Sequence, residues 1–390
     1  MSTLQQRVRR GLSFMHAQRQ QALWRVVEAL LKGGKLWLSS LGRFRGSPGQ
    51  DKHGIKAVDR LLGNLALRRE KLRVYRAMAA WTLRRMHNPI VLVDITEIRP
   101  GVCALTASIA LSGRSLPLYG IVRRKETVTR RRTAGTFLNQ LGSILPDSVV
   151  PIIITDAGFE SPWFDEVERR GWHYVGRVRH QTRFHYRDQW VSAQQLHVLA
   201  TNRARSLGRL RFPRHKAHAR RLVLSKQRVS KGRARTNTRR RKGRTANDRR
   251  CEKAAREPWL LATSLTCRPA AVVEIYAMRM QIEQNYRDAK SHRWGWQLSL
   301  SGSRTNARLE ILLLIAALGS LAVLAAGAIA ERKNHHLRYQ ANTIRCRRVL
   351  SWFALGVLLL RARDPFLTPR IFASGLDELR NNLRGLEHVT

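Results

Sequence analysis

A run of twenty uncharged residues, positions 311–330, constrains the fold more than any other segment of the chain. Ser320 is its one overtly polar residue, and half of the run is Ala, Gly or Ser. The length satisfies the rule for a membrane-spanning helix, but a helix buried in a large core is apolar on all sides in the same way. Because the run stands alone and basic residues crowd both neighbouring regions, we favour a buried core helix and expect no membrane association.

The charge of the chain indicates its partner. Its 390 residues include 73 Lys and Arg against 26 Asp and Glu, a formal net charge of +47. Such a surplus favours a polyanion, and nucleic acid is the natural candidate. Affinity should then fall steeply with salt, because each neutralised phosphate releases counterions. A ribosomal or DNA-packing protein would have the same composition, so charge predicts the partner and not the activity.

The cysteines and histidines predict no zinc site. The four cysteines form no CxxC pair, and no second ligand pair at zinc spacing follows the adjacent His335 and His336. We expect each cysteine to be a small buried apolar residue. No secretory signal opens the chain, which favours a reducing cytoplasm. The four are Cys103, Cys251, Cys267 and Cys346.

The pattern along the chain changes twice. Residues 1–85 are basic and predicted helical, and the loop signal at 42–49 before the helical spacing at 55–64 suggests a DNA-docking domain of helix-turn-helix type. From Pro89 onward, strand and helix patterns are mixed, which favours an α/β core. In residues 201–250, twenty of fifty are Lys or Arg, and we interpret them as a solvated basic loop that could order against phosphates.

Two aspartates are predicted to close buried strands. The apolar runs at 90–93 and 149–154 lead into Asp94 and Asp156, 62 residues apart. Carboxylates at the ends of neighbouring strands can converge on one cation, and Mg²⁺ prefers such oxygen ligands. The alternative is that each aspartate simply caps the following turn.

A helix predicted over residues 269–291 carries a third carboxylate. At 100° per residue, one narrow stripe of this helix contains a tyrosine, two cations and a glutamate. Such a stripe is unsuited to a core and suits a surface that holds a metal together with a phosphate backbone, although a salt-bridged solvent face is the alternative. The four residues are Tyr276, Arg279, Glu283 and Lys290.

The spacing Tyr276-x2-Arg279-x3-Glu283-x6-Lys290 resembles the signature around the catalytic glutamate of bacterial transposases of the insertion-sequence-four family, most closely the Tn-ten transposase branch. The likeness runs in order from about residue 50 to 355. Further blocks that resemble this branch are Val91-Leu-Val-Asp94, Thr155-Asp-Ala-Gly-Phe159 with Pro162-Trp163, Glu257-Pro-Trp-Leu-Leu-Ala-Thr263 and Gln340-Ala-Asn-Thr343. The segment 294–301 fits only loosely, and residues 201–250 are more basic than the family leads us to expect.

The resemblance implies a fold and a division into domains. The fold is α/β, an RNase-H-like catalytic core with a β-rich basic insertion, preceded by a helical DNA-binding domain. We expect a helical domain over 1–85, the catalytic domain over 86–365 with its insertion at about 175–265, and a C-terminal segment over 366–390. The apolar run at 311–330 matches a buried helix of the family.

The resemblance also implies an active site. Asp94, Asp156 and Glu283 would be catalytic and would hold two Mg²⁺ ions, for which Mn²⁺ can substitute. Tyr276, Arg279 and Lys290 match positions that bind phosphates near the transposon end. Trp259 matches a tryptophan that stacks on a flipped base; the alternative is a half-buried tryptophan at a strand start. Since Glu97, Glu160 and Asp165 match no family position, we interpret them as solvent-facing or supporting residues.

The resulting prediction is a cut-and-paste DNA transposase in the cytoplasm, associated with the nucleoid. It would nick transposon ends, form and resolve hairpins, and join the 3′-OH ends to target DNA, working as a homodimer on terminal inverted repeats. Activity should fail at low pH, because the carboxylates must be ionised to bind metal. A nuclease that cleaves without joining, and a non-catalytic DNA-binding descendant of a transposase, remain alternatives.

Overall fold

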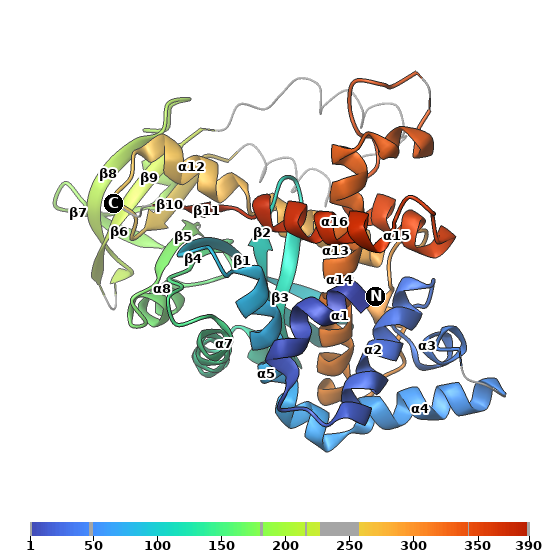
Figure 1. Ribbon diagram of the computed structural model, residues 1–390. Coiled ribbons are helices and arrows are strands. Elements are labelled where there is room, and N and C mark those ends of the chain that lie inside the picture. Colours follow the sequence, from blue (N-terminus) through green and yellow to red (C-terminus); the bar gives the residue numbers. More distant parts are fainter. Residues whose placement is uncertain are drawn as a thin grey trace, which may run out of the picture. The chain divides into compact units, whose positions relative to one another are not determined.

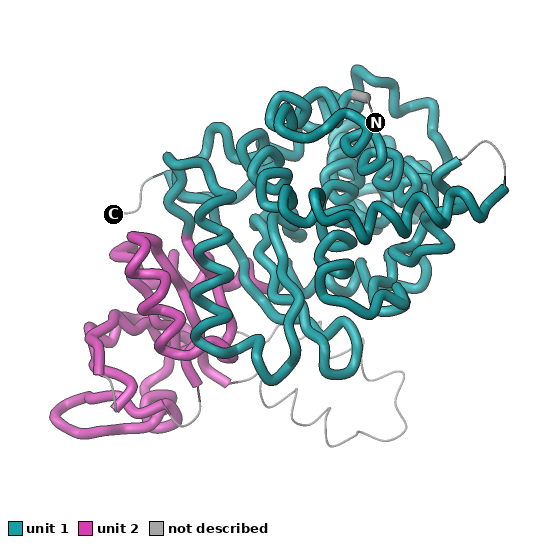
Figure 2. Tube along the Cα trace, turned by 90° about the horizontal axis from the view of Figure 1, so that it is seen from below, with its two compact units in different colours: residues 1–151, 280–387 teal, residues 152–279, 388–390 magenta. Residues whose placement is uncertain are grey.

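The protein is described by a computed structural model covering residues 2–46, 50–179, 182–214, 217–226, 257–341 and 343–387. It is mixed α/β, as predicted, and divides into two compact units (Figure 1, Figure 2). Unit 1 comprises Met1–Pro151 and Met280–Glu387, and unit 2 comprises Ile152–Arg279 with the last three residues. Of the predicted basic segment at 201–250, residues 215–216 and 227–250 lie outside the described residues.

Unit 1 begins with helices and continues into three long strands. The predicted helical character of residues 1–85 is confirmed, while their role in DNA binding stays a prediction. The elements are α1 (Ser2–Arg9), η1 (Arg10–Leu12), α2 (Ala17–Leu31), α3 (Leu38–Phe44), α4 (Asp51–Gly63), α5 (Leu65–Thr82), β1 (Asn88–Arg99), β2 (Val102–Ala110), β3 (Ser115–Arg124), α6 (Lys125–Val128) and α7 (Arg131–Ile144).

The C-terminal part of unit 1 is largely helical. Its last element, β11 (Gly385–Leu386), pairs with the start of β1. The other elements are α13 (Met280–Lys290), η3 (Leu298–Leu300), α14 (Asn306–Arg332), η4 (His335–Tyr339), α15 (Trp352–Ala362) and α16 (Pro369–Asn381).

The apolar run at 311–330 forms the centre of α14, and the predicted core helix is confirmed. This helix is long and apolar enough to cross a membrane, but 89% of its most apolar window is buried inside the protein. It packs against β3, α2, α15 and α16. Gly327 and Gly356 permit a close crossing of α14 and α15, because a side chain at either position would collide with the backbone of the other helix.

Strands β1, β2 and β3 form an antiparallel meander. Asp94 lies opposite Thr106 on β2, and Thr106 lies opposite Gly120 on β3. Because side chains alternate between the two faces of a sheet, Asp94 and Thr96 share one face of β1.

Unit 2 contains a mixed sheet. Strand β4 runs parallel to β5, and the order then continues through β10, β9, β8, β6 and β7 by antiparallel pairing. The elements are β4 (Ile152–Thr155), α8 (Ser161–Glu168), β5 (His173–Val178), β6 (Arg183–Tyr186), β7 (Gln189–Ser192), α9 (Ala193–His197), β8 (Arg205–Phe212), β9 (His218–Ser225), β10 (Trp259–Thr263) and α12 (Pro269–Ala277).

Part of the predicted basic loop at 201–250 is a strand pair instead. Strands β8 and β9 occupy residues that we expected to be solvated loop, and Leu222 and Leu224 on β9 are buried. Arg220 on β9 is only 2% exposed, and an ion pair with Asp165 on α8 balances its charge. Asp165 is half-buried and has the supporting role of a counterion.

Candidate active site

Asp94 lies within β1 and not at its end. Residues 89–93 are buried, whereas 94–96 are half-buried and Glu97 is exposed. The strand nevertheless continues to Arg99, because the pairing with β2 extends past Asp94 to Val102. The expectation of a strand-closing aspartate is wrong here: Asp94 marks the point where the fully buried stretch of the strand ends. Its Oδ1 accepts a hydrogen bond from the main-chain N–H of Ile95 at 2.8 Å.

Helix α13 lies across the three strands of unit 1 and is held there by polar side chains. The Tyr286 hydroxyl lies 2.6 Å from the Thr106 hydroxyl and donates to the Asp94 carbonyl oxygen at 3.3 Å. Asp288 forms an ion pair with Arg114 at 2.7 Å. These contacts fix the face that the helix presents to the strand carrying Asp94.

Glu283 and Lys290 lie on the same side of α13. They are seven residues, or about two turns, apart, so their side chains point in nearly the same direction. Lys290 Nζ donates to the hydroxyl of Thr96 at 2.9 Å, two residues beyond Asp94 on the same face of β1. Glu283 is half-buried one turn before Tyr286. Unit 1 thus combines a strand aspartate with a helical glutamate and a helical lysine.

Asp156 follows the last residue of β4, so the predicted strand-end position is confirmed. The strand begins at Ile152, later than the apolar run suggested. Asp156 is half-buried, and its Oδ1 accepts a hydrogen bond from the main-chain N–H of Gly158 at 2.8 Å. It therefore makes the turn contact that we considered as the alternative, and its second oxygen atom takes no part in that contact.

The predicted helix over 269–291 is two helices. Helix α12 ends at Ala277 and α13 begins at Met280, and Arg279 N–H bonds to the Tyr276 carbonyl oxygen at 3.0 Å in a tightened last turn. The single stripe from Tyr276 to Lys290 therefore does not exist. Tyr276 and Arg279 belong to unit 2, whereas Glu283 and Lys290 belong to unit 1.

Trp259 and Tyr276 contact each other in unit 2. Trp259 is the first residue of β10 and is half-buried, and its ring meets the edge of Tyr276 with centroids 4.8 Å apart. Tyr276 is only 3% exposed. Burial raises the pKa of Tyr276, while the neighbouring Arg279 and Arg177 oppose this shift. Positive charges therefore lie near the aromatic pair.

A buried and a half-buried arginine beside this tyrosine were not predicted from the sequence. Arg177 is 8% exposed, and its guanidinium donates to the Glu257 carboxylate at 3.1 Å. Arg179 shares the same carboxylate at 2.9 Å. Burial lowers the pKa of Arg177 to about 10. Two arginines at alternate positions within and just after a largely apolar strand were the available signal, because such cations are rarely buried without a counterion or ligand.

The candidate metal ligands are carboxylates. Within the described ranges no three His, Cys, Asp or Glu side chains gather at one place to hold an ion. Asp94 and Glu283 belong to unit 1 and Asp156 to unit 2, so the structure describes the two parts of the candidate site separately. Each supplies oxygen atoms in a partly exposed position, which suits a hard divalent cation.

These features define a class of protein. The chain is mixed α/β and highly basic, and it pairs acidic with cationic groups on its strands and helices. Such an arrangement suits phosphate chemistry on nucleic acid. The chain belongs to the transposase DDE domain family, whose model matches residues 89–319, more than half of its length. The mixed α/β architecture is consistent with an RNase-H-like catalytic domain of this family. A search of curated proteins found no match. The chain is therefore a transposase enzyme, and DNA is its substrate.

Proposed function

We propose that the chain is a cut-and-paste transposase of the insertion-sequence-four family, in the branch that includes the Tn-ten transposase. The observation that carries this proposal is the family match over residues 89–319, which includes Asp94, Asp156 and Glu283. The four-residue signature that ends at Lys290 supports the assignment to the branch.

Asp94, Asp156 and Glu283 form the catalytic site of this proposal and hold two Mg²⁺ ions, with Mn²⁺ able to substitute. When bound, such ions lower the pKa of an attacking water and stabilise charge on the phosphoryl group. The residues around them position the acids. Tyr286 joins α13 to the backbone of Asp94, and Lys290 places a positive charge beside Thr96.

Four further residues act on the DNA. Tyr276, Arg279 and Lys290 bind backbone phosphates near the transposon end. Trp259 stacks on an extruded base. Its half-buried ring and its edge contact with Tyr276 are consistent with both the stacking role and a structural one. Arg177 adds a buried positive charge to the same part of unit 2.

Residues 1–85 bind DNA through α3 and α4. These helices cross closely where Gly42 meets Gly54. Glycine permits this approach, since a side chain at either position would collide with the other helix. Three cations spaced by four residues are exposed along one side of α4, while both acids of α4 form ion pairs with arginines of neighbouring segments. The helix therefore presents a positive stripe. The cations are Lys52, Lys56 and Arg60.

The proposal also includes the domain bounds, the order of the reaction steps and the oligomeric state. The catalytic domain spans 86–365 with a β-rich insertion at about 175–265, and the strands β5–β10 support that division. The enzyme nicks the terminal inverted repeats and uses each freed 3′-OH to form a hairpin. It resolves the hairpin and joins the ends to target DNA. A homodimer pairs the two ends in the cytoplasm, at the nucleoid.

The test is cleavage of DNA that carries the element's own ends, taken from the DNA flanking this gene. Wild type and Glu283→Ala are incubated with Mg²⁺, and products are separated under denaturing conditions. The proposal expects hairpin-ended fragments from the wild type alone. Cleavage without hairpins or joined products would identify a nuclease. Equal binding with no cutting by either protein would favour the non-catalytic alternative.

A further inference from the structure

A cluster of exposed cations lies where β3 leads into α6 and α7. Between positions 124 and 132 there are five basic residues and one acid, Glu126. All five are exposed. They are Arg124, Lys125, Arg130, Arg131 and Arg132, and we call them the α6–α7 cluster.

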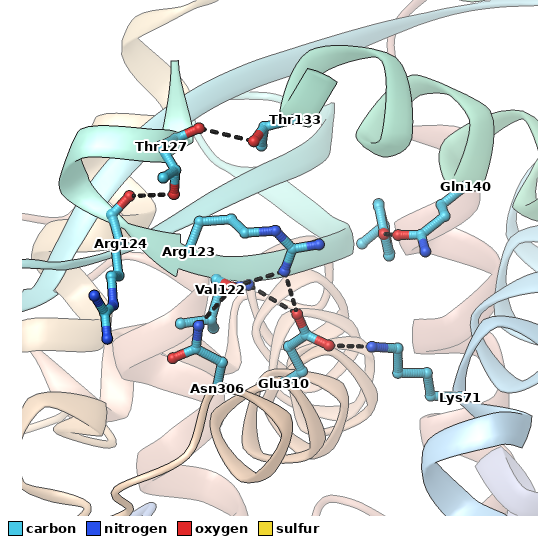
Figure 3. Close-up of polar contacts among 10 residues, drawn as sticks. Lys71, Val122, Arg123, Arg124, Thr127, Thr133, Gln140, Asn306 and Glu310 are labelled. Carbon is cyan, nitrogen blue, oxygen red and sulfur yellow. Dashed lines mark hydrogen bonds and ion pairs between the residues drawn. The ribbon is translucent and has the colours of Figure 1, made fainter. Parts of the chain in front are cut away.

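Arg123, the residue before the cluster on β3, differs from the cluster because its counterion lies inside the protein. Arg123 and Arg124 point to opposite sides of the strand, as Figure 3 shows. Arg123 bonds to the buried carboxylate of Glu310 at 3.1 Å, and Lys71 bonds to the same carboxylate. Glu310 is 6% exposed, so the charges of Arg123 and Lys71 are balanced inside the protein.

Three of the outward-facing cations have no such counterion. Among the residues that the structure describes, Arg124, Arg130 and Arg132 take part in no ion pair. Lys125 approaches Glu97 at 3.8 Å, but both side chains are well exposed, so that pair stabilises little. The charges of these three arginines are therefore available to an external anion.

The cluster is tied to the strand that carries the proposed catalytic aspartate. The main-chain N–H of Lys125 bonds to the Gly101 carbonyl oxygen at 3.0 Å, which ties α6 to the turn after β1. Asp94 lies on the same strand, five residues before its end at Arg99.

We propose that the α6–α7 cluster binds the backbone of the double-stranded DNA outside the terminal repeat, beyond the phosphate held at Asp94. The inference rests on the proposed function. In Figure 1, α4 and α7 lie on either side of α5, so the cluster is separate from the helix proposed to bind the repeat. Arginines and lysines alone suit this DNA, because its sequence differs at every insertion and phosphate contacts carry no sequence information.

The experiment measures binding without metal ions, so that no strand is cut. Two duplexes carry the terminal repeat, one ending flush at the cleavage point and one continuing into a long stretch of flanking DNA. The variant carries Arg124→Gln, Arg130→Gln and Arg132→Gln. The control carries Lys333→Gln, Arg338→Gln and Arg370→Gln, three exposed cations of unit 1 outside the cluster.

We expect the flank to increase the affinity of wild type and control, and to add little for the cluster variant. On the flanked duplex, the slope of log affinity against log salt should become shallower by up to about 2.7, or about 0.9 per lost contact. The triple substitution by Lys should restore binding, which excludes misfolding. Equal benefit from the flank in variant and wild type, no benefit in the wild type, or equal loss on both duplexes would overturn the proposal.

This outcome is separate from that of the proposed function. Binding requires no chemistry, so an inactive enzyme can still show the flank effect. Conversely, an enzyme that cuts and joins DNA without any flank effect would retain the proposed function and remove the role of the cluster.

Discussion

The hydroxyl of Tyr286 on α13 donates a hydrogen bond to the main-chain oxygen of Asp94 on β1, 192 residues earlier in the chain, at 3.3 Å. The same hydroxyl lies 2.6 Å from that of Thr106 on β2. One side chain thus joins the proposed glutamate helix to the strand that carries the first proposed aspartate.

Tyr286→Phe should slow single-turnover DNA cleavage by about five- to tenfold. Losing a hydrogen bond of about 1 kcal/mol loosens α13 against β1, and that energy corresponds to roughly this factor in rate. Tyr339→Phe is the matched control, because it removes a hydroxyl bonded to Asp364 away from the proposed site. If both variants lose stability but only Tyr339→Phe keeps the wild-type cleavage rate, Tyr286 positions the site. Equal rates in both variants would contradict this role.

Lys290→Gln should weaken DNA binding and reduce the salt slope by about 1, as expected for one lost phosphate contact. Its ammonium group bonds to Thr96 at 2.9 Å and is exposed at the end of α13. Lys290→Arg retains the charge and should retain most of the affinity. Fluorescence anisotropy across a salt series measures both. An unchanged slope for Lys290→Gln would show that Lys290 contacts no phosphate.

Glu257→Gln should destabilise the protein by about 3 kcal/mol, because it leaves Arg177 buried with a neutral partner. Denaturant unfolding of wild type and variant gives the difference. Glu160→Gln, at an exposed position, is the control and should be close to neutral. A change below about 0.5 kcal/mol for Glu257→Gln would mean that solvent, and not Glu257, compensates the arginine pair.

Asp364 should stabilise the fold above about pH 4 and lose this contribution at lower pH. Burial opposes its ionisation, but hydrogen bonds from His335, Tyr339 and the Phe366 amide lower the pKa of Asp364 from 3.8 to about 2. Because the folded pKa is the lower one, stability is fully present above the unfolded value and is lost as pH falls through 2.

Asp364→Asn is therefore expected to cost about 2 kcal/mol at neutral pH. The difference from wild type should shrink between pH 4 and pH 2, which unfolding at several pH values measures. A difference that stays constant over this range would contradict the account.

The sequence predicted the elements whose causes are local. The uncharged run at 311–330 had to be a buried or membrane helix, and α14 is buried. The apolar run before Asp156 ends where β4 ends. The strand after Asp94 was cut short in the prediction because polar Thr96 and Glu97 interrupt the apolar run, although pairing with β2 continues to Arg99.

Features that depend on distant partners could not be predicted. The break between α12 and α13 falls at Met278 and Arg279, which are good helix formers, so no local signal marks it. Arg220 belongs to a basic segment, and its counterion Asp165 lies 55 residues away on α8. Because of that break, Tyr276 belongs to one unit and Glu283 to the other. Helical periodicity, which assumes one continuous helix, therefore could not predict how these two residues are arranged.

The central claim is that Asp94, Asp156 and Glu283 act together, and strand cleavage of terminal-repeat DNA with Mg²⁺ tests it most directly. The variants are Asp94→Asn, Asp156→Asn and Glu283→Gln, singly and combined, with Glu97→Gln, an exposed acid on β1, as control. The account predicts that each single variant loses at least about a thousandfold in rate and that the triple variant is hardly worse, because the three act as a unit. Near-normal cleavage by Glu283→Gln, or equal loss in Glu97→Gln, would contradict it.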